Sequence, residues 1–87
     1  MSTNLTVNDL FKRGAIPIAA VHAAADTYLT HPGTGMLPLG RAYAVNVVAA
    51  VEADALARCL LRDPGVALPV KQAAARTAIL LARPRER

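Results

Sequence analysis

The chain has 87 residues, a formal net charge of +4 and a single cysteine, and aromatic side chains make up only 3% of it. This length suits one domain with a modest core and is too short for separate catalytic and lid domains. The lone Cys59 excludes an internal disulfide, and two histidines are too few for a structural zinc site, so a reducing, cytoplasmic setting is expected.

Alanine supplies 19 of the apolar residues, so the core must be built from leucine, valine, isoleucine and close helix contacts. Such small side chains bury little area in a short chain, which favours completion by a second copy or a partner. Residues 1–14 lack the features of a signal peptide. The longest uncharged apolar run, 42–51, is well short of the roughly 20 residues that span a bilayer, so no membrane contact is expected.

The first predicted element is a short helix near residues 7–13. Thr6 precedes Asp9 by three residues, which is a variant of the capping box at a helix N-terminus. Gly14 follows the last apolar residues and is expected to end this helix.

A second helix is predicted over 17–30. Pro17 suits the first turn, and apolar residues then recur at spacings of three and four until His31-Pro32-Gly33 stops the helix. His22 falls within the apolar stripe, and His31 is expected to lie at the C-terminal end of the helix.

Residues 30–40 hold three of the five glycines and two of the six prolines. A phosphate-binding loop needs converging backbone amides and usually a lysine, but Pro32 and Pro38 remove two amides and no lysine lies within 20 residues of 33–35. The stretch is therefore predicted to be a rigid bend between helices. In this bend Met36 and Leu37 either tuck beneath the bundle or form a contact for a partner.

The third predicted helix, 39–62, is the longest and is expected to be the central element of the fold. Its first half is apolar nearly all round, and such a helix must be covered on every side. Asn46 lies within this half, either as a buried amide that fixes the register of paired helices or as an amide satisfied by a nearby loop. The candidate self-association interface is Val45, Asn46, Val47, Val48 and Val51.

The fourth predicted helix, 69–83, begins at a proline suited to its first turn, and the tail 84–87 is expected to be frayed. Five basic residues against one acidic residue give the final 19 residues a net charge of +4. A basic helix of this kind contacts either phosphates or an acidic protein. The candidate partner or nucleic-acid surface is Lys71, Gln72, Arg76, Ile79 and Arg83.

Catalytic and metal-binding patterns are weak. His22 and Asp26 are four residues apart, a spacing that allows an imidazole and a carboxylate to pair, but no nucleophile accompanies them. Cys59 lies next to an arginine yet is expected to be a small buried residue without reactivity. We therefore predict no catalytic, metal or cofactor site.

Together these patterns predict an all-α single domain, 1–87, made of three principal helices (17–30, 39–62 and 69–83) and a short N-terminal one (7–13). The expected function is a non-catalytic protein-interaction module, of the kind found among small inhibitors and regulators of phages and plasmids, which binds a protein partner or forms a homodimer. The excess of arginine over lysine suggests a GC-rich bacterial or phage genome. The alternative is a small basic DNA- or RNA-associated regulator that uses Arg76, Arg83 and the tail.

Overall fold

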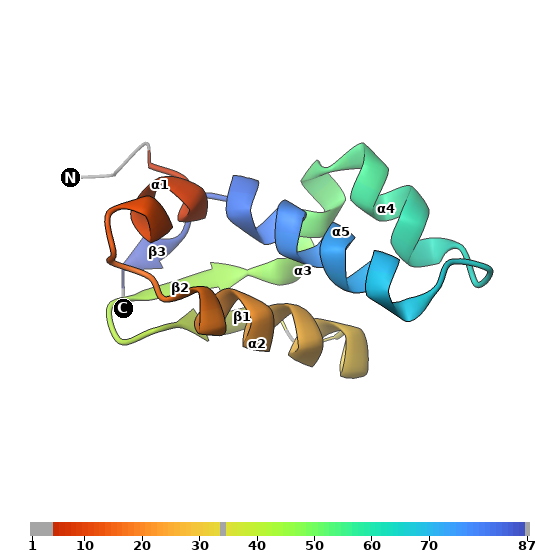
Figure 1. The fold of residues 1–87 in the computed structure, drawn as a ribbon, viewed down its shortest axis with the longest axis horizontal. Coiled ribbons are helices and arrows are strands. Elements are labelled where there is room, and N and C mark those ends of the chain that lie inside the picture. Colours follow the sequence, from red (N-terminus) through yellow and green to blue (C-terminus); the bar gives the residue numbers. More distant parts are fainter. Residues whose placement is uncertain (1–4, 34, 87) are drawn as a thin grey trace.

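The computed structural model describes residues 5–33 and 35–86 and has two layers (Figure 1). One layer consists of helices, and the other consists of one helix and a small antiparallel sheet. The helices are α1 (Val7–Lys12), α2 (Ile18–Thr30), α3 (Val47–Ala53), α4 (Ala55–Arg62) and α5 (Leu68–Leu81). The strands are β1 (Met36–Leu39), β2 (Tyr43–Asn46) and β3 (Arg85–Glu86), with β2 in the middle of the sheet. The chain therefore has a small α+β fold, and the all-α prediction is wrong.

The predicted capping box at the start of α1 is confirmed. The Asp9 backbone amide donates to Thr6 Oγ1 at 3.3 Å, and the Thr6 amide donates to Asp9 Oδ2 at 3.0 Å. Two hydrogen bonds from Thr6 hold the pKa of Asp9 below its ordinary value. The bond from the Thr6 backbone has the larger effect, and the bond from its hydroxyl has the smaller one. The Val7 amide then donates to the Ala82 carbonyl at 2.9 Å, so the capped helix is fastened to the end of α5.

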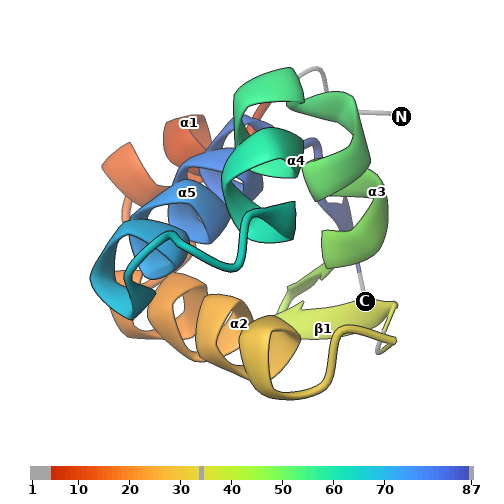
Figure 2. The ribbon, with the colours of Figure 1, turned by 90° about the vertical axis from the view of Figure 1, so that its right-hand side faces the viewer.

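Helices α2 and α5 form close to where the sequence predicts them. α2 starts after Pro17 and ends at His31, whose amide donates to the Thr27 carbonyl at 2.8 Å. α5 carries Pro69 in its first turn and contacts α1, α2, α3 and α4. In Figure 2, α5 lies between α1 and α4, above α2. The central element is therefore α5.

The predicted helix 39–62 does not exist as one element. Its residues form part of a β-hairpin and then two short helices, α3 and α4. Along the hairpin, burial alternates: Leu37 and Leu39 on β1 and Val45 on β2 are buried, whereas Met36 and Asn46 are exposed. This period of two is the pattern of a half-buried sheet, so the apolar residues face one side of a sheet and do not surround a helix.

Two side chains start the helices that follow the hairpin. Asn46 ends β2 and caps α3, with its Oδ1 accepting from the Ala49 amide at 3.1 Å. Asp54 has an extended backbone (φ −108°, ψ 105°) that ends α3, and its Oδ1 accepts from the Ala57 amide at 3.1 Å to cap α4. Both residues satisfy amide groups that an unbroken helix would have paired internally. The chain therefore bends at Asp54.

Residues 85 and 86 of the C-terminal tail form strand β3, in contrast to the predicted frayed tail 84–87, of which residue 87 lies outside the described residues. Pro84 is buried. Arg85 pairs with Ala44 and Glu86 pairs with Tyr43 on β2. β2 is thus a central strand, and the last part of the chain covers what would otherwise be its open edge.

The hairpin loop, residues 40–42, requires a glycine at its first position. Gly40 has φ +77°, and a Cβ atom there would lie 3.3 Å from Pro17 Cδ. We expect Gly40→Ala to lower the free energy of unfolding by about 1–2 kcal/mol, because an L-residue is strained at this φ. Urea denaturation followed by circular dichroism measures this loss.

Gly33→Ala is the matched control for this substitution. Gly33 is exposed, has no positive φ, and an added Cβ there would meet nothing within 4 Å. Its free energy of unfolding should change by less than about 0.5 kcal/mol. Equal effects of the two substitutions would contradict the hairpin geometry at Gly40.

Candidate functional site

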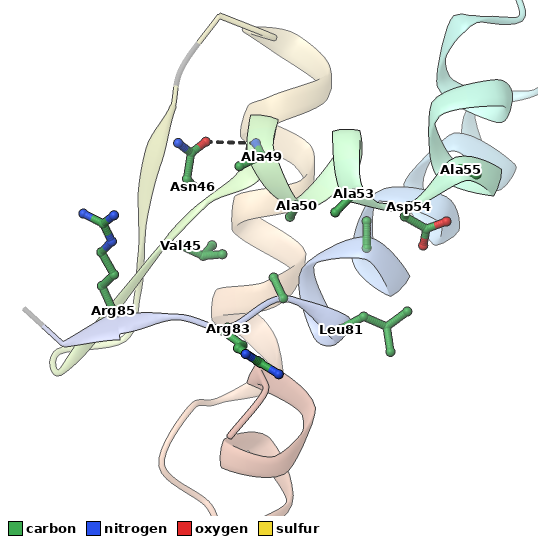
Figure 3. Close-up of a pocket in the computed structure, with 12 residues that line it drawn as sticks. Val45, Asn46, Ala49, Ala50, Ala53, Asp54, Ala55, Leu81, Arg83 and Arg85 are labelled. Carbon is green, nitrogen blue, oxygen red and sulfur yellow. Dashed lines mark hydrogen bonds between the residues drawn. The ribbon is translucent and has the colours of Figure 1, made fainter. Parts of the chain in front are cut away.

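A groove of about 640 Å³ opens between α3, the end of α5 and strands β2 and β3 (Figure 3). We call it the α3–α5 groove. Half of its lining residues are alanines, with Val45 on the β2 side and Leu81 on the α5 side. The alanines are Ala49, Ala50, Ala53, Ala55, Ala78 and Ala82. Small side chains leave room for another molecule to approach the backbone closely, so the groove is suited to receive larger apolar side chains.

Two arginines flank one end of the α3–α5 groove. α5 ends at Leu81, and Pro84 restricts the preceding residue to an extended conformation, so Arg83 lies in the connection to β3. Arg85 follows on β3 itself, and both side chains are exposed. Within residues 5–33 and 35–86, neither forms an ion pair, whereas Arg62 pairs with Glu52 at 3.5 Å. The two guanidinium groups are therefore available to an acidic ligand.

The opposite end of the α3–α5 groove carries a carboxylate. Asp54 lines the groove at the bend between α3 and α4. Its Oδ1 accepts from the Ala57 amide, and its Oδ2 forms no hydrogen bond with the described residues. The groove is thus apolar along its length, positive at the β3 end and negative at the bend.

A second, smaller groove of about 220 Å³ lies between α4 and the first half of α5. We call it the α4–α5 groove. It is lined by Leu56, Leu60, Val70 and Thr77, together with alanines, and it shares Asp54 with the α3–α5 groove. Leu56 is 69% exposed and Val70 is 45% exposed. Because both grooves lie along α5 and share a residue, they form one apolar surface.

One face of α5 runs along both grooves without cover. Val70, Ala73, Thr77 and Leu81 are spaced by three, four and four residues, which places them on one side of a helix, and all four are exposed. We call these four residues the α5 strip. Leu81, at its end, is 63% exposed. The opposite side of α5 is in the core, since Ala75 and Ile79 are completely buried.

The predicted self-association interface is mostly internal. Val45, Val47 and Val51 are at most 3% exposed and belong to the core of the chain itself, and Val48 is half-buried. Asn46 is exposed and caps α3. It is therefore neither a buried amide that fixes the register of paired helices nor an amide satisfied by a nearby loop. Val45, Val47 and Val51 are therefore covered by their own chain, although Val45 also lines the α3–α5 groove.

The predicted basic surface on α5 does not form one exposed patch. Ile79 is completely buried, and Lys71, Gln72 and Arg76 are half-buried. Gln72 faces α2, where its Nε2 donates to Asp26 Oδ1 at 3.5 Å, and the buried Nε of Arg76 has no hydrogen-bond partner within the described part of the chain. Of these five residues, Arg83 contributes to the α3–α5 groove.

The residues considered for catalysis, His22, Asp26 and Cys59, do not form a common site in the structure. His22 is exposed on α2, contrary to its predicted place in the apolar stripe, and the hydrogen bonds that Asp26 forms go to Gln72 and Thr30. Cys59 is exposed on α4, contrary to the buried position predicted for it. Within the described ranges, no three histidine, cysteine or acidic side chains gather as metal ligands do.

Sequence reasoning missed most of the groove because its residues come from separate segments. Asn46, Asp54 and Arg85 are brought together only once the hairpin, the bend and β3 have formed. The short alternation of Leu37 with Leu39 and of Val45 with Val47, on either side of Gly40, is the signal that predicts the hairpin.

Comparisons of the chain with protein-family models, with curated proteins and with solved structures find no match. No helix in the described residues has both the length and the apolar character required to cross a bilayer.

Proposed function

We propose that this protein is a non-catalytic protein-binding module that receives a segment of a partner protein in the α3–α5 groove. The observation that carries the proposal is a groove of about 640 Å³ that is lined by alanines and has at one end two arginines, Arg83 and Arg85, that form no ion pair with any described residue. Concave, mainly apolar sites of this volume with a few charged groups are typical of binding sites. Such a module would regulate or inhibit its partner by covering part of the partner's surface.

The chemistry of the groove favours binding over catalysis. Its described lining supplies apolar contacts, two guanidinium groups and a carboxylate that already caps α4. The planar guanidinium of arginine serves in the recognition of carboxylates, where its fork of donors forms paired hydrogen bonds. The exposed thiol of Cys59 suits a reducing compartment, so we place the module in the cytoplasm.

A nucleic-acid-binding regulator remains the second candidate, but fewer observations support it. Lys71 and Arg76 are half-buried, so they do not extend the charge of Arg83 and Arg85 into a broad basic surface. A phosphate backbone also leaves an apolar groove unfilled, and burial of the groove walls is what stabilises a protein complex.

The test is affinity capture from an extract of cells that produce the protein, with two variants as bait beside the unmodified chain. Ala53→Arg places a long charged side chain in the α3–α5 groove, whereas Ala23→Arg places the same side chain on exposed α2, away from the groove. Both positions are exposed, so both variants should fold. We expect one protein to be retained by the unmodified chain and by Ala23→Arg, and its retention to fall about tenfold or more with Ala53→Arg.

Two results would contradict the proposal. Equal retention by both variants would show that the α3–α5 groove is not the binding site. Retention that disappears after nuclease treatment would favour the nucleic-acid regulator instead.

A further inference from the structure

The α3–α5 groove continues into the α4–α5 groove, because both are walled by α5 and both are lined by Asp54. The α5 strip, from Val70 to Leu81, runs along the whole of this surface. At about 1.5 Å per residue the strip is roughly 16 Å long, which is the length of three helical turns. A bound segment that covers both grooves must therefore be regular and elongated, with apolar side chains on one side.

We infer that the partner segment is an acidic amphipathic helix that lies along the α5 strip and over both grooves. This inference rests on the proposed function and specifies the partner of the same site. Apolar side chains of such a helix recur at intervals of three and four residues, as do the four residues of the strip. The alanine walls allow its backbone to approach, and Leu56, Val70 and Leu81 are 69%, 45% and 63% exposed, so each gains buried area on contact.

Charge complementarity decides in favour of an acidic helix. Arg83 and Arg85, at one end of the surface, form no ion pair within residues 5–33 and 35–86, and the chain carries a net charge of +4. Acidic residues at the end of the bound helix that lies over these arginines would form charge-assisted hydrogen bonds. Opposite Asp54, in the middle of the surface, the helix carries no acidic side chain, since two carboxylates repel each other there.

The other occupants fit these charges less well. A second copy brings the same net charge of +4, and Asp54 is the one carboxylate that lines either groove in the described part of the chain. An extended strand would need a free sheet edge, and the edge strand that lines the α3–α5 groove, β3, is only two residues long. An acidic helix matches both the apolar strip and the arginines.

The experiment is a selection of random 16-residue peptides displayed on ribosomes or phage, with the full chain as the immobilised target. We expect the enriched peptides to share apolar residues at positions i, i+3 or i+4, and i+7, and to carry aspartate or glutamate at one end. Synthetic versions should gain helical circular dichroism on binding. Their affinity for Ala53→Arg should fall about tenfold or more, whereas their affinity for Ala23→Arg should be unchanged.

A charge reversal separates the acidic part of the inference from the apolar part. The double substitution Arg83→Glu and Arg85→Glu should lower the affinity of the chain for the selected peptides about tenfold or more. Peptides whose acidic residues are changed to lysine should regain affinity for this variant. The matched control, Arg13→Glu with Arg41→Glu, changes the net charge equally at exposed positions outside both grooves and should leave affinity within about threefold.

The results distinguish failure of the inference from failure of the proposed function. Peptides that are blocked by Ala53→Arg but are neutral, basic or non-helical would overturn the acidic helix and leave the groove as a protein-binding site. Peptides that bind Ala53→Arg as well as the unmodified chain would overturn both, as would a library from which nothing is enriched. Self-association of the chain that Ala53→Arg abolishes, measured by sedimentation, would assign the surface to a second copy instead.

Discussion

Replacement of Ile79 by alanine is expected to destabilise the protein by about 2–5 kcal/mol. Ile79 is completely buried on α5, and α5 contacts four other helices. A domain of this size has a free energy of unfolding on the order of 5–10 kcal/mol, so the loss is a large part of the total. Urea denaturation followed by circular dichroism should show an earlier transition with a similar slope.

Leu81→Ala is the matched control for this effect, since it lies on the same helix but is 63% exposed. Its free energy of unfolding should change by less than about 0.5 kcal/mol, while binding of the selected peptides weakens because Leu81 forms a wall of the α3–α5 groove. The opposite outcome, a stable Ile79→Ala that fails to bind, would support the sequence-based assignment of Ile79 to a partner surface.

The helices that could be predicted from the sequence are those marked by local signals. Thr6 and Asp9 specify the start of α1 through hydrogen bonds three residues apart. Pro17 is the N-cap of α2, and Pro69 lies in the first turn of α5. Each signal acts within one turn of chain and does not depend on what packs against it. Such elements are accordingly found within one or two residues of their predicted bounds.

The hairpin escaped prediction because its strands are only four residues long and contain misleading residues. Pro38 is compatible with a first helical turn as well as with an edge strand, and Ala44 has a high helix propensity although it lies in the central strand. Tertiary packing overrides these preferences, since Leu39 and Val45 reach the core only from a sheet. A run of alanines and valines therefore did not distinguish a helix covered on all sides from a strand followed by a capped helix.

The same error explains why the candidate site was not predicted from the sequence. When residues 39–62 are taken as one helix, Asp54 lies in the middle of it and the tail has no strand to pair with, so no groove forms. In the structure, the bend at Asp54 and the pairing of Arg85 with Ala44 bring α3, α5 and β3 around one space. Arg83 was predicted to belong to a partner surface because its charge is visible in the sequence. The alanines that line the groove were not predicted to belong to a partner surface, because alanine occurs both in cores and on exposed helix faces.

Replacement of Leu39 by alanine tests the sheet directly and is expected to cost about 2–5 kcal/mol. Leu39 is completely buried and lies opposite Tyr43, next to the hairpin loop. Leu39 belongs to the core cluster, so removal of its side chain leaves a cavity among buried residues. Thermal and urea unfolding measure the loss.

Met36→Ala, in the same strand, is the control that makes the test specific. Met36 lies on the other face of β1 and is 46% exposed, so its replacement should change the free energy of unfolding by less than about 0.5 kcal/mol. A large loss at residue 39 with almost none at residue 36 follows from the alternation of faces along a strand. Equal losses at the two positions would contradict the hairpin, and with it the β2 and β3 walls of the α3–α5 groove, because those walls exist only if β1 holds β2 in register.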